Sequence, residues 1–234
     1  MPNKPYIEKI QEVDGFTVWR VDGKYIRSNM DAEFTNFGQH FRFPFIPTHE
    51  LWIDYEKTPT EDSYFIDHML LEWLLMEQGM PYEKAIVKAD AKEAIQRKRS
   101  AFMQKIEKVE KKPKEFKKEL YVKELKGFDA VKVFVVNGEI VRDLYFIDYT
   151  EGGHHFVYDF VPFDEVWLDD DLAASEMDFV LLHELHERYL MSTGWDYHKA
   201  HHSSTIIEYK ARKNPELVDA LIKEEIEKNK KIAG

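Results

Sequence analysis

A chain of 234 residues with 44% hydrophobic and 14% aromatic residues can bury a sizeable core, as one large domain or two small ones. The formal net charge of -11 argues against general nucleic-acid binding, and the absence of cysteine excludes disulfides, zinc ribbons, iron–sulfur sites and thiol catalysis. No apolar run approaches the ~20 residues of a membrane span, and the N-terminus lacks the apolar region of a secretory signal, so we expect a cytoplasmic protein without membrane contact.

The sequence reads as a tandem duplication in which the two halves align without a gap. Roughly 30% of the aligned pairs match between residue 16 and residue 93, far above chance for one fixed offset. We expect a first repeat over residues 1–119, which includes a basic connector from about residue 97, and a second repeat over residues 120–234. The matched pairs include Gly23 with Gly138, His40 with His155, Trp52 with Trp167, His68 with His183, Glu72 with Glu187, and Glu93 with Glu208.

Each repeat is predicted to begin with a β-hairpin. The dipeptides Asp22-Gly23 and Asn137-Gly138 lie between short apolar runs, and such dipeptides supply the positive φ angles of a tight hairpin turn. The expected strand pairs are residues 16–20 with 24–27 in the first repeat and residues 131–136 with 139–142 in the second.

Two further strands and two helices are expected to complete each repeat. Helix N-terminal signals precede the helices, with Pro81 and Asp196 at the start of the second helix of each pair. The unit is therefore ββββαα, and the whole chain an α+β protein built from a pseudo-symmetric pair of such units. The expected ranges are strands at 40–45 and 155–161, short strands at 51–54 and 166–169, and first helices at 63–77 and 176–192.

The connector between the repeats has a different composition. Residues 97–126 carry many more lysines and arginines than acidic residues. We interpret this segment as a solvated helical strut that breaks at Pro113, with Phe102, Ile106 and Val109 as its buried stripe. A contact to an acidic partner or a nucleic acid is the functional alternative.

One stretch of the second repeat gathers histidines and glutamates in helical register. His183 and Glu187 are four residues apart and share one face of a helix, while His201 and Glu208 share one face of the next helix. A short turn makes the two helices antiparallel neighbours, so the two stripes can face each other. Because their surroundings are apolar, these groups must be neutralised by one another or by a metal ion.

The two repeats differ at the positions that bear on this choice. The first repeat keeps the three equivalents of His183, Glu187 and Glu208, which indicates a structural role for that set. It has Met69 in place of Glu184 and Ile86 in place of His201. The second repeat therefore holds the richer polar set and is the candidate metal site.

The segment from Trp167 through the apolar run that ends in His183-Glu184-Leu185 resembles the strand and active-site helix of small zincin metallopeptidases, the minigluzins of the ImmA/IrrE type. The resemblance covers about forty residues and implies that His183 is a metal ligand and Glu184 the general base. It departs from the family at the second ligand position, where H-E-x-x-H becomes H-E-x-x-E with Glu187. A carboxylate there can bind zinc and also suits manganese or iron.

The leading hypothesis is a metal-dependent hydrolase of zincin type that acts on peptide or protein substrates. Its metal ligands would be drawn from His183, Glu187, His201 and Glu208, with Glu184 as the base beside a metal-bound water. Zinc is the first candidate metal. The alternative is a non-catalytic binding or scaffold protein in which the duplicated cluster is structural, and a nucleic-acid accessory role of the basic connector ranks third. For His155 we expect a bond to backbone, with a third metal ligand as the alternative.

Overall fold

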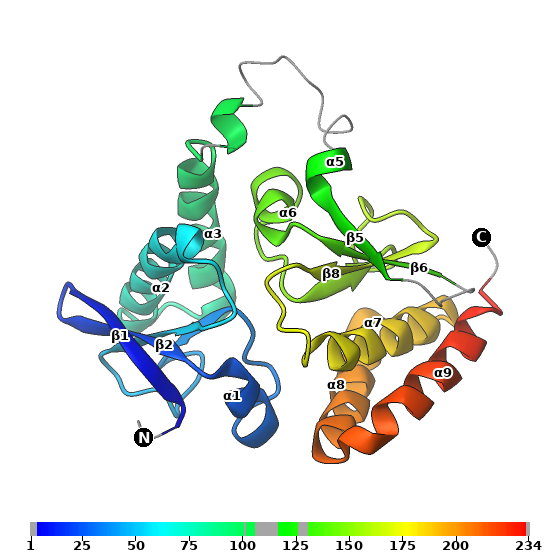
Figure 1. Ribbon diagram of the computed structural model, residues 1–234. Coiled ribbons are helices and arrows are strands. Elements are labelled where there is room, and N and C mark those ends of the chain that lie inside the picture. The colour runs from blue at the N-terminus through cyan, green and yellow to red at the C-terminus, as the bar shows by residue number, and fades with distance from the viewer. Residues whose placement is uncertain (1–3, 101, 106–116, 126–130, 233–234) are drawn as a thin grey trace. The chain divides into compact units, whose positions relative to one another are not determined.

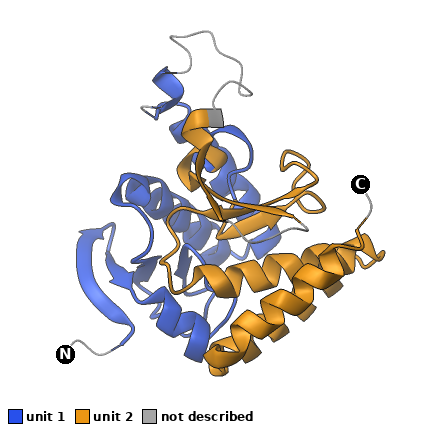
Figure 2. Cartoon of the chain, turned by 45° about the vertical axis from the view of Figure 1, so that its right-hand side comes forward, with its two compact units in different colours: residues 1–115, 142–148 blue, residues 116–141, 149–234 orange. Residues whose placement is uncertain are grey.

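The protein is described by a computed structural model, which places residues 4–100, 102–105, 117–125 and 131–232. The chain divides into two compact units: residues 1–115 with 142–148, and residues 116–141 with 149–234 (Figure 2). Each unit contains a four-stranded mixed sheet followed by helices, so the predicted α+β class with a repeated unit is confirmed. No helix within these described ranges is both long and apolar enough to cross a lipid bilayer.

The first sheet has the strand order β1-β2-β4-β3. β2 pairs antiparallel with β1 and parallel with β4, and β3 pairs antiparallel with β4. The elements are β1 (Tyr6–Val13), β2 (Phe16–Val21), α1 (Gly23–Asn29), β3 (Phe37–Gln39), β4 (Glu50–Asp54), the 3-10 turn η1 (Pro59–Glu61), α2 (Asp62–Glu77) and α3 (Tyr82–Arg97).

The second sheet repeats this topology in the order β5-β6-β8-β7, with the same parallel and antiparallel pairings. Its unit ends in three helices, of which α8 and α9 both pack against α7 (Figure 1). The elements are α5 (Lys117–Leu120), β5 (Tyr121–Leu125), β6 (Lys132–Val136), α6 (Gly138–Leu144), β7 (Gly152–His154), β8 (Glu165–Asp169), α7 (Met177–Ser192), α8 (Tyr197–Lys213), the 3-10 turn η3 (Pro215–Leu217) and α9 (Val218–Asn229).

The core of each unit lies between its sheet and its first long helix. Side chains alternate across a strand, so β6 and β8 present one apolar set to α7. Val133, Val166 and Leu168 are fully buried there against Leu182 and Leu185 of the helix. In the first unit the matching cluster joins β2 and β4 to α2. This packing fixes α7, and with it the polar residues that α7 carries.

The predicted hairpins at the two Gly dipeptides are wrong. Residues 23–29 and 138–144 are the helices α1 and α6, and Asp22 is the N-cap of α1, accepting a 2.8 Å hydrogen bond from the backbone of Tyr25. Gly23 is needed because its backbone lies against the buried Asp54, where an added Cβ would come within 1.8 Å of a carboxylate oxygen. The dipeptide is therefore a capping signal and a close approach rather than a turn.

The first unit does contain a β-hairpin, one connection earlier in the chain. β1 and β2 are antiparallel and are joined at Asp14 and Gly15, which have φ angles of 48° and 83°. Positive φ at both central residues is the requirement of a type I′ turn, which is one of the two common two-residue hairpin turns. The corresponding residues of the second unit, 126–130, lie outside the described residues.

The predicted strands at residues 40–45 and 155–161 are also wrong. The strands there end earlier, at Gln39 and His154, and the chain then turns with helix-like hydrogen bonds from Phe43 and Tyr158 back to those strand ends. The aromatic residues of both segments fold over the sheet instead of extending it. Their alternating apolar pattern therefore reflects packing of a compact loop.

The remaining predicted elements are confirmed within one or two residues. The short strands β4 and β8 and the long helices α2 and α7 occupy the expected positions. Asp196 caps α8 by accepting a hydrogen bond from the backbone of Lys199. Pro81 directly precedes α3.

The connector agrees in part with the expected helical strut, because residues 102–105 and Lys117–Leu120 are helical, and departs from it at both ends. Its first residue, Arg97, is buried at the end of α3, and residues 121–125 form the strand β5. Phe102 lies in the described stretch 102–105 and is half-buried. The predicted positions of Ile106, Val109 and Pro113 fall outside the described residues.

Candidate metal centre

Three polar atoms from two helices of the second unit converge on one point. His183 and Glu187 lie one turn apart on α7, and His201 lies on the facing helix α8. Nδ1 of His201 is 2.9 Å from Oε2 of Glu187 and 3.2 Å from Nε2 of His183, and the last two atoms are 3.7 Å apart. The sequence prediction named all three residues, and the fold brings them together.

The opposite nitrogen of His183 has a different environment. Its Nδ1 lies 2.8 Å from Oε2 of Glu208, whose other oxygen accepts a 2.8 Å bond from Arg212. Arg212 in turn pairs with the fully buried Glu176. Glu208, the fourth predicted ligand, therefore lies behind the imidazole and not beside the three converging atoms.

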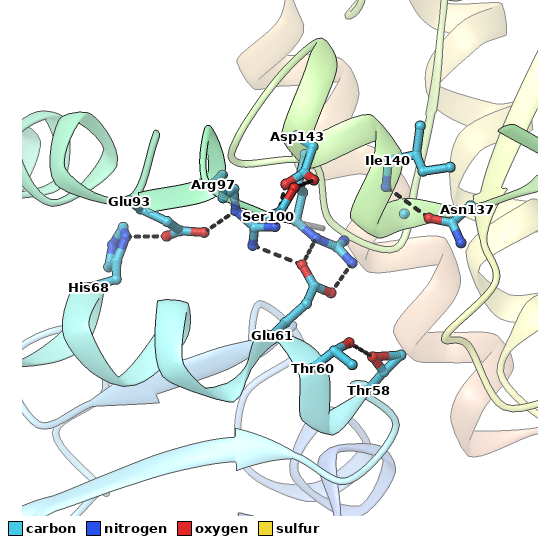
Figure 3. A network of polar contacts seen from close by, with 12 residues as sticks. Thr58, Thr60, Glu61, His68, Glu93, Arg97, Ser100, Asn137, Ile140 and Asp143 are labelled. Atoms are coloured by element: carbon cyan, nitrogen blue, oxygen red, sulfur yellow. Dashed lines mark hydrogen bonds and ion pairs between the residues drawn. The ribbon is translucent and has the colours of Figure 1, made fainter. Parts of the chain in front are cut away.

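The first unit contains the same supporting chain. Nδ1 of His68 lies 2.9 Å from Glu93, Glu93 accepts from Arg97 at 2.7 Å, and Arg97 pairs with Glu61 at 2.8 Å (Figure 3). All four side chains are buried. We call this His–Glu–Arg–Glu arrangement the frame; it comprises His68, Glu93, Arg97 and Glu61 in the first unit and His183, Glu208, Arg212 and Glu176 in the second. Both units retain the frame, as we expect of a set of residues that stabilises the fold.

The frame of the first unit has a pH dependence that follows from its charges. Burial lowers the pKa of His68, but hydrogen bonds and charges of Glu72 and Glu93 outweigh it and raise the pKa to about 9. Burial and the charge of Asp148 also raise the pKa of Asp90, to about 7. In both groups the folded state favours the protonated form, so both contributions are lost as pH rises.

We therefore expect the stability of the first unit to fall between pH 6 and pH 9, by on the order of 3 kcal/mol from His68 alone. The stabilisation by His68 is complete below its ordinary pKa of about 6.5 and disappears as pH passes about 9. Urea unfolding of the wild type and of His68→Gln at several pH values measures it. An equal pH slope in both proteins would contradict the assignment.

The second unit differs from the first at several positions around the converging atoms. Ile86 and Met69 stand in the first unit where the second has His201 and Glu184. Phe37 stands where the second has Gly152, and its ring packs against His68 with the centroids 5.1 Å apart. The first unit thus has the frame, but apolar side chains stand at the positions of Gly152, Glu184 and His201.

Gly152 opens a small pocket in the second unit. The pocket has a volume of about 70 Å³ and is lined by Gly152, Gly153, Thr150, Val157 and Tyr158 together with the polar residues of α7 and α8. A Cβ on Gly152 would lie 3.1 Å from the Glu184 carboxyl, so glycine leaves room for that side chain against the strand. Glu184 therefore reaches the pocket beside the three converging atoms.

The electrostatics of the pocket are those of buried, mutually dependent charges. Burial and the neighbouring Glu187 raise the pKa of Glu184 to about 8. Burial opposes ionisation of Glu187 as well, but hydrogen bonds with His154, His183 and His201 hold its pKa well below the ordinary value. His183 has a raised pKa, because its bonds to Glu187 and Glu208 outweigh its burial. Oε2 of Glu184 is buried without a hydrogen-bond partner among the described residues.

Sequence reasoning missed Gly152 in the pocket lining and His154 directly behind Glu187. His154 ends β7 with its side chain fully buried, and its Nε2 lies 3.2 Å from Oε1 of Glu187. Attention went to its neighbour His155, which matches His40 between the repeats; Nδ1 of His155 is 3.0 Å from the carbonyl of Val161, so the expected backbone bond is confirmed. His154 and Gly152 differ between the repeats, and a comparison of differences would have found both.

Two other polar groups of the second unit lie outside the pocket lining. His186 bridges Ser203 on α8 and Glu225 on α9, at 3.0 Å and 2.9 Å, and so ties the three helices together. The run Asp169–Asp171 could also group around an ion. Its carboxylates accept backbone N–H groups, from Asp171 to Asp169 and from Gly138 to Asp170, which is the behaviour of loop and cap residues.

Comparison with known proteins gives no family assignment. A scan of family models, a search of curated proteins and a search of solved structures each returned no match to this chain. The geometry of the pocket is therefore the evidence for its function.

Proposed function

We propose that the second unit is a metal-dependent hydrolase of zincin type, with a single ion held by His183, Glu187 and His201. The observation that carries the proposal is the triangle of 2.9, 3.2 and 3.7 Å between the three donor atoms. Ligand atoms 2.0–2.1 Å from a tetrahedral ion lie roughly 3.3 Å apart, so these atoms already occupy one face of such a tetrahedron. Two imidazoles and one carboxylate form a donor set of catalytic zinc sites.

The frame supports the same assignment. A histidine ligand commonly has its second ring nitrogen bonded to a carboxylate, which fixes the ring and makes it a better donor. Glu208 occupies that place on His183. We therefore reassign Glu208 from ligand to supporting residue. Its counterpart Glu93 is retained in the first unit, which lacks the third donor, as a supporting role allows.

The pocket supplies what hydrolysis needs beyond the ligands. An ion with one open position lowers the pKa of a bound water toward neutrality. Glu184 lines the same pocket as the three donor atoms and would take the proton of a water held there as that water attacks a carbonyl carbon. The pocket has room beside the donor atoms for a water and a carbonyl group. The substrate class that we propose is a peptide, because its carbonyl group is small and is presented on a chain.

The decisive variants are Glu184→Gln and Glu184→Met. The second places in this pocket the residue that the first unit accommodates, fully buried, at the matching position. We expect both proteins to keep their metal and to lose roughly 100- to 10,000-fold in turnover of a quenched fluorescent peptide library.

Each outcome decides between functions. Turnover that survives in both variants would remove Glu184 as the base. Tight metal binding without turnover of any peptide by the wild type would favour the non-catalytic alternative, in which the ion only joins α7 to α8. Zinc is the first metal to load, followed by manganese and iron, because a carboxylate ligand suits all three.

A further inference from the structure

His154 occupies the position in the second unit that Gln39 occupies in the first. Both end the edge strand of their sheet: Gln39 pairs with Leu51, and His154 pairs with Val166 at the same register. Both side chains are fully buried. Each faces the glutamate one helical turn after the frame histidine, Glu72 or Glu187.

The polar contacts of the two side chains correspond atom by atom. The backbone N–H of Phe41 donates to Oε1 of Gln39 at 2.7 Å, and Nε2 of Gln39 donates to Oε1 of Glu72 at 2.6 Å. In the second unit the N–H of Phe156 donates to Nδ1 of His154 at 3.2 Å, and Nε2 of His154 lies 3.2 Å from Oε1 of Glu187.

This correspondence determines where the imidazole carries its proton. An amide oxygen can only accept and an amide nitrogen can only donate, so the roles in the first unit are fixed. Because Nδ1 of His154 accepts an N–H, the neutral ring has its proton on Nε2, which points at a carboxylate oxygen. A nitrogen that carries a proton has no lone pair for a metal ion.

We infer that His154 is a positioning residue that donates from Nε2 to Oε1 of Glu187, and that it is not itself a metal ligand. One ligand atom from each of His154, Glu184 and Glu187 also lies within 4.8 Å of the other two. The competing interpretation is therefore that His154 binds a metal ion itself. Holding Oε1 leaves Oε2 of Glu187 directed at His183 and His201, as a one-oxygen ligand. The inference rests on the proposed function for the presence of the ion, whereas the inferred hydrogen bond from His154 to Glu187 does not depend on that function.

Substitution by the residue of the first unit separates the two roles. We expect His154→Gln to bind zinc within about threefold of the wild type, and His154→Leu to bind roughly 10- to 100-fold more weakly, the usual cost of losing a supporting partner. His183→Gln serves as the ligand-loss standard, and Gln39→Leu in the first unit, which removes the equivalent bond, should leave zinc affinity unchanged. A loss in His154→Gln as large as in His183→Gln would overturn the inference.

A second measurement remains valid if the proposed function fails. The nitrogen chemical shifts of His154 in the metal-free wild type should show a protonated Nε2 and a bare Nδ1. The opposite tautomer would overturn the positioning role whatever the metal results are. A wild type that binds no zinc but shows the expected tautomer would reject the proposed function and retain the hydrogen bond to Glu187.

Discussion

The His201→Ile variant is expected to lose tight zinc binding while its second unit stays folded. The substitution removes one of three donor atoms, and its effect should exceed the roughly 10- to 100-fold cost of losing a supporting partner, reaching at least about 1,000-fold. Folding should survive because Ile86 occupies the matching position of the first unit, and because the side chain of His201 is 33% exposed. Competition with a chromophoric chelator measures the dissociation constant.

His202→Ile is the matched control for this variant. His202 is the next residue of α8, is exposed, and lies outside the three converging donors. The same change of side chain there should leave the zinc affinity within about twofold, since exposed substitutions rarely alter a site they do not touch. Equal affinities of His201→Ile and the wild type would show that the donor triangle is not the binding site.

The reverse substitution, Ile86→His, is expected to create a second metal site in the first unit. Nε2 of His68 and Oε2 of Glu72 are already 3.6 Å apart, against 3.7 Å for the matching pair in the second unit. Gln39 holds the other oxygen of Glu72, so only the third donor is missing. The bound metal should rise from one equivalent to two.

Phe37 is the obstacle to this second site, because its ring packs on His68. Adding Phe37→Gly should tighten the new site, although removal of a partly buried phenylalanine costs about 3 kcal/mol or more of stability. The His201→Ile chain is the sharpest background, since Ile86→His should restore one equivalent to it. Val87→His, one residue further along α3 and 63% exposed, is the control that should add none. A folded Ile86→His protein that binds no additional metal, with or without Phe37→Gly, would refute the shared geometry.

The sequence allowed prediction of the repeat, of the long helices and of the meeting of His183, Glu187 and His201, because these depend on local spacing. Residues four apart share a helix face, and a short turn forces the two helices to be antiparallel neighbours. The capping role of Asp22 was misjudged because it depends on a tertiary fact, the buried Asp54 against which Gly23 is packed. An Asp-Gly dipeptide looks the same in both cases.

His154 and Gly152 escaped prediction for a different physical reason. Both residues matter because the edge strand β7 lies against α7. The alternating apolar pattern placed that strand at residues 155–161, whereas it covers Gly152–His154. Glutamine and histidine also look unrelated in an alignment, although each presents an acceptor and a donor at similar reach. From the sequence, Glu208 was as good a candidate ligand as Glu187. In the fold its carboxylate contacts Nδ1 of His183, on the side of the ring away from the other donor atoms.

The metal content of the full chain tests the central claim most directly. The protein would be purified without a metal-affinity tag, and zinc, manganese and iron would be counted by elemental mass spectrometry in the wild type and in His201→Ile. We predict one equivalent of metal in the wild type and none in the folded variant. A wild type that holds no metal, even after incubation with each ion in turn, would contradict the assignment and leave the cluster as a buried hydrogen-bonded core.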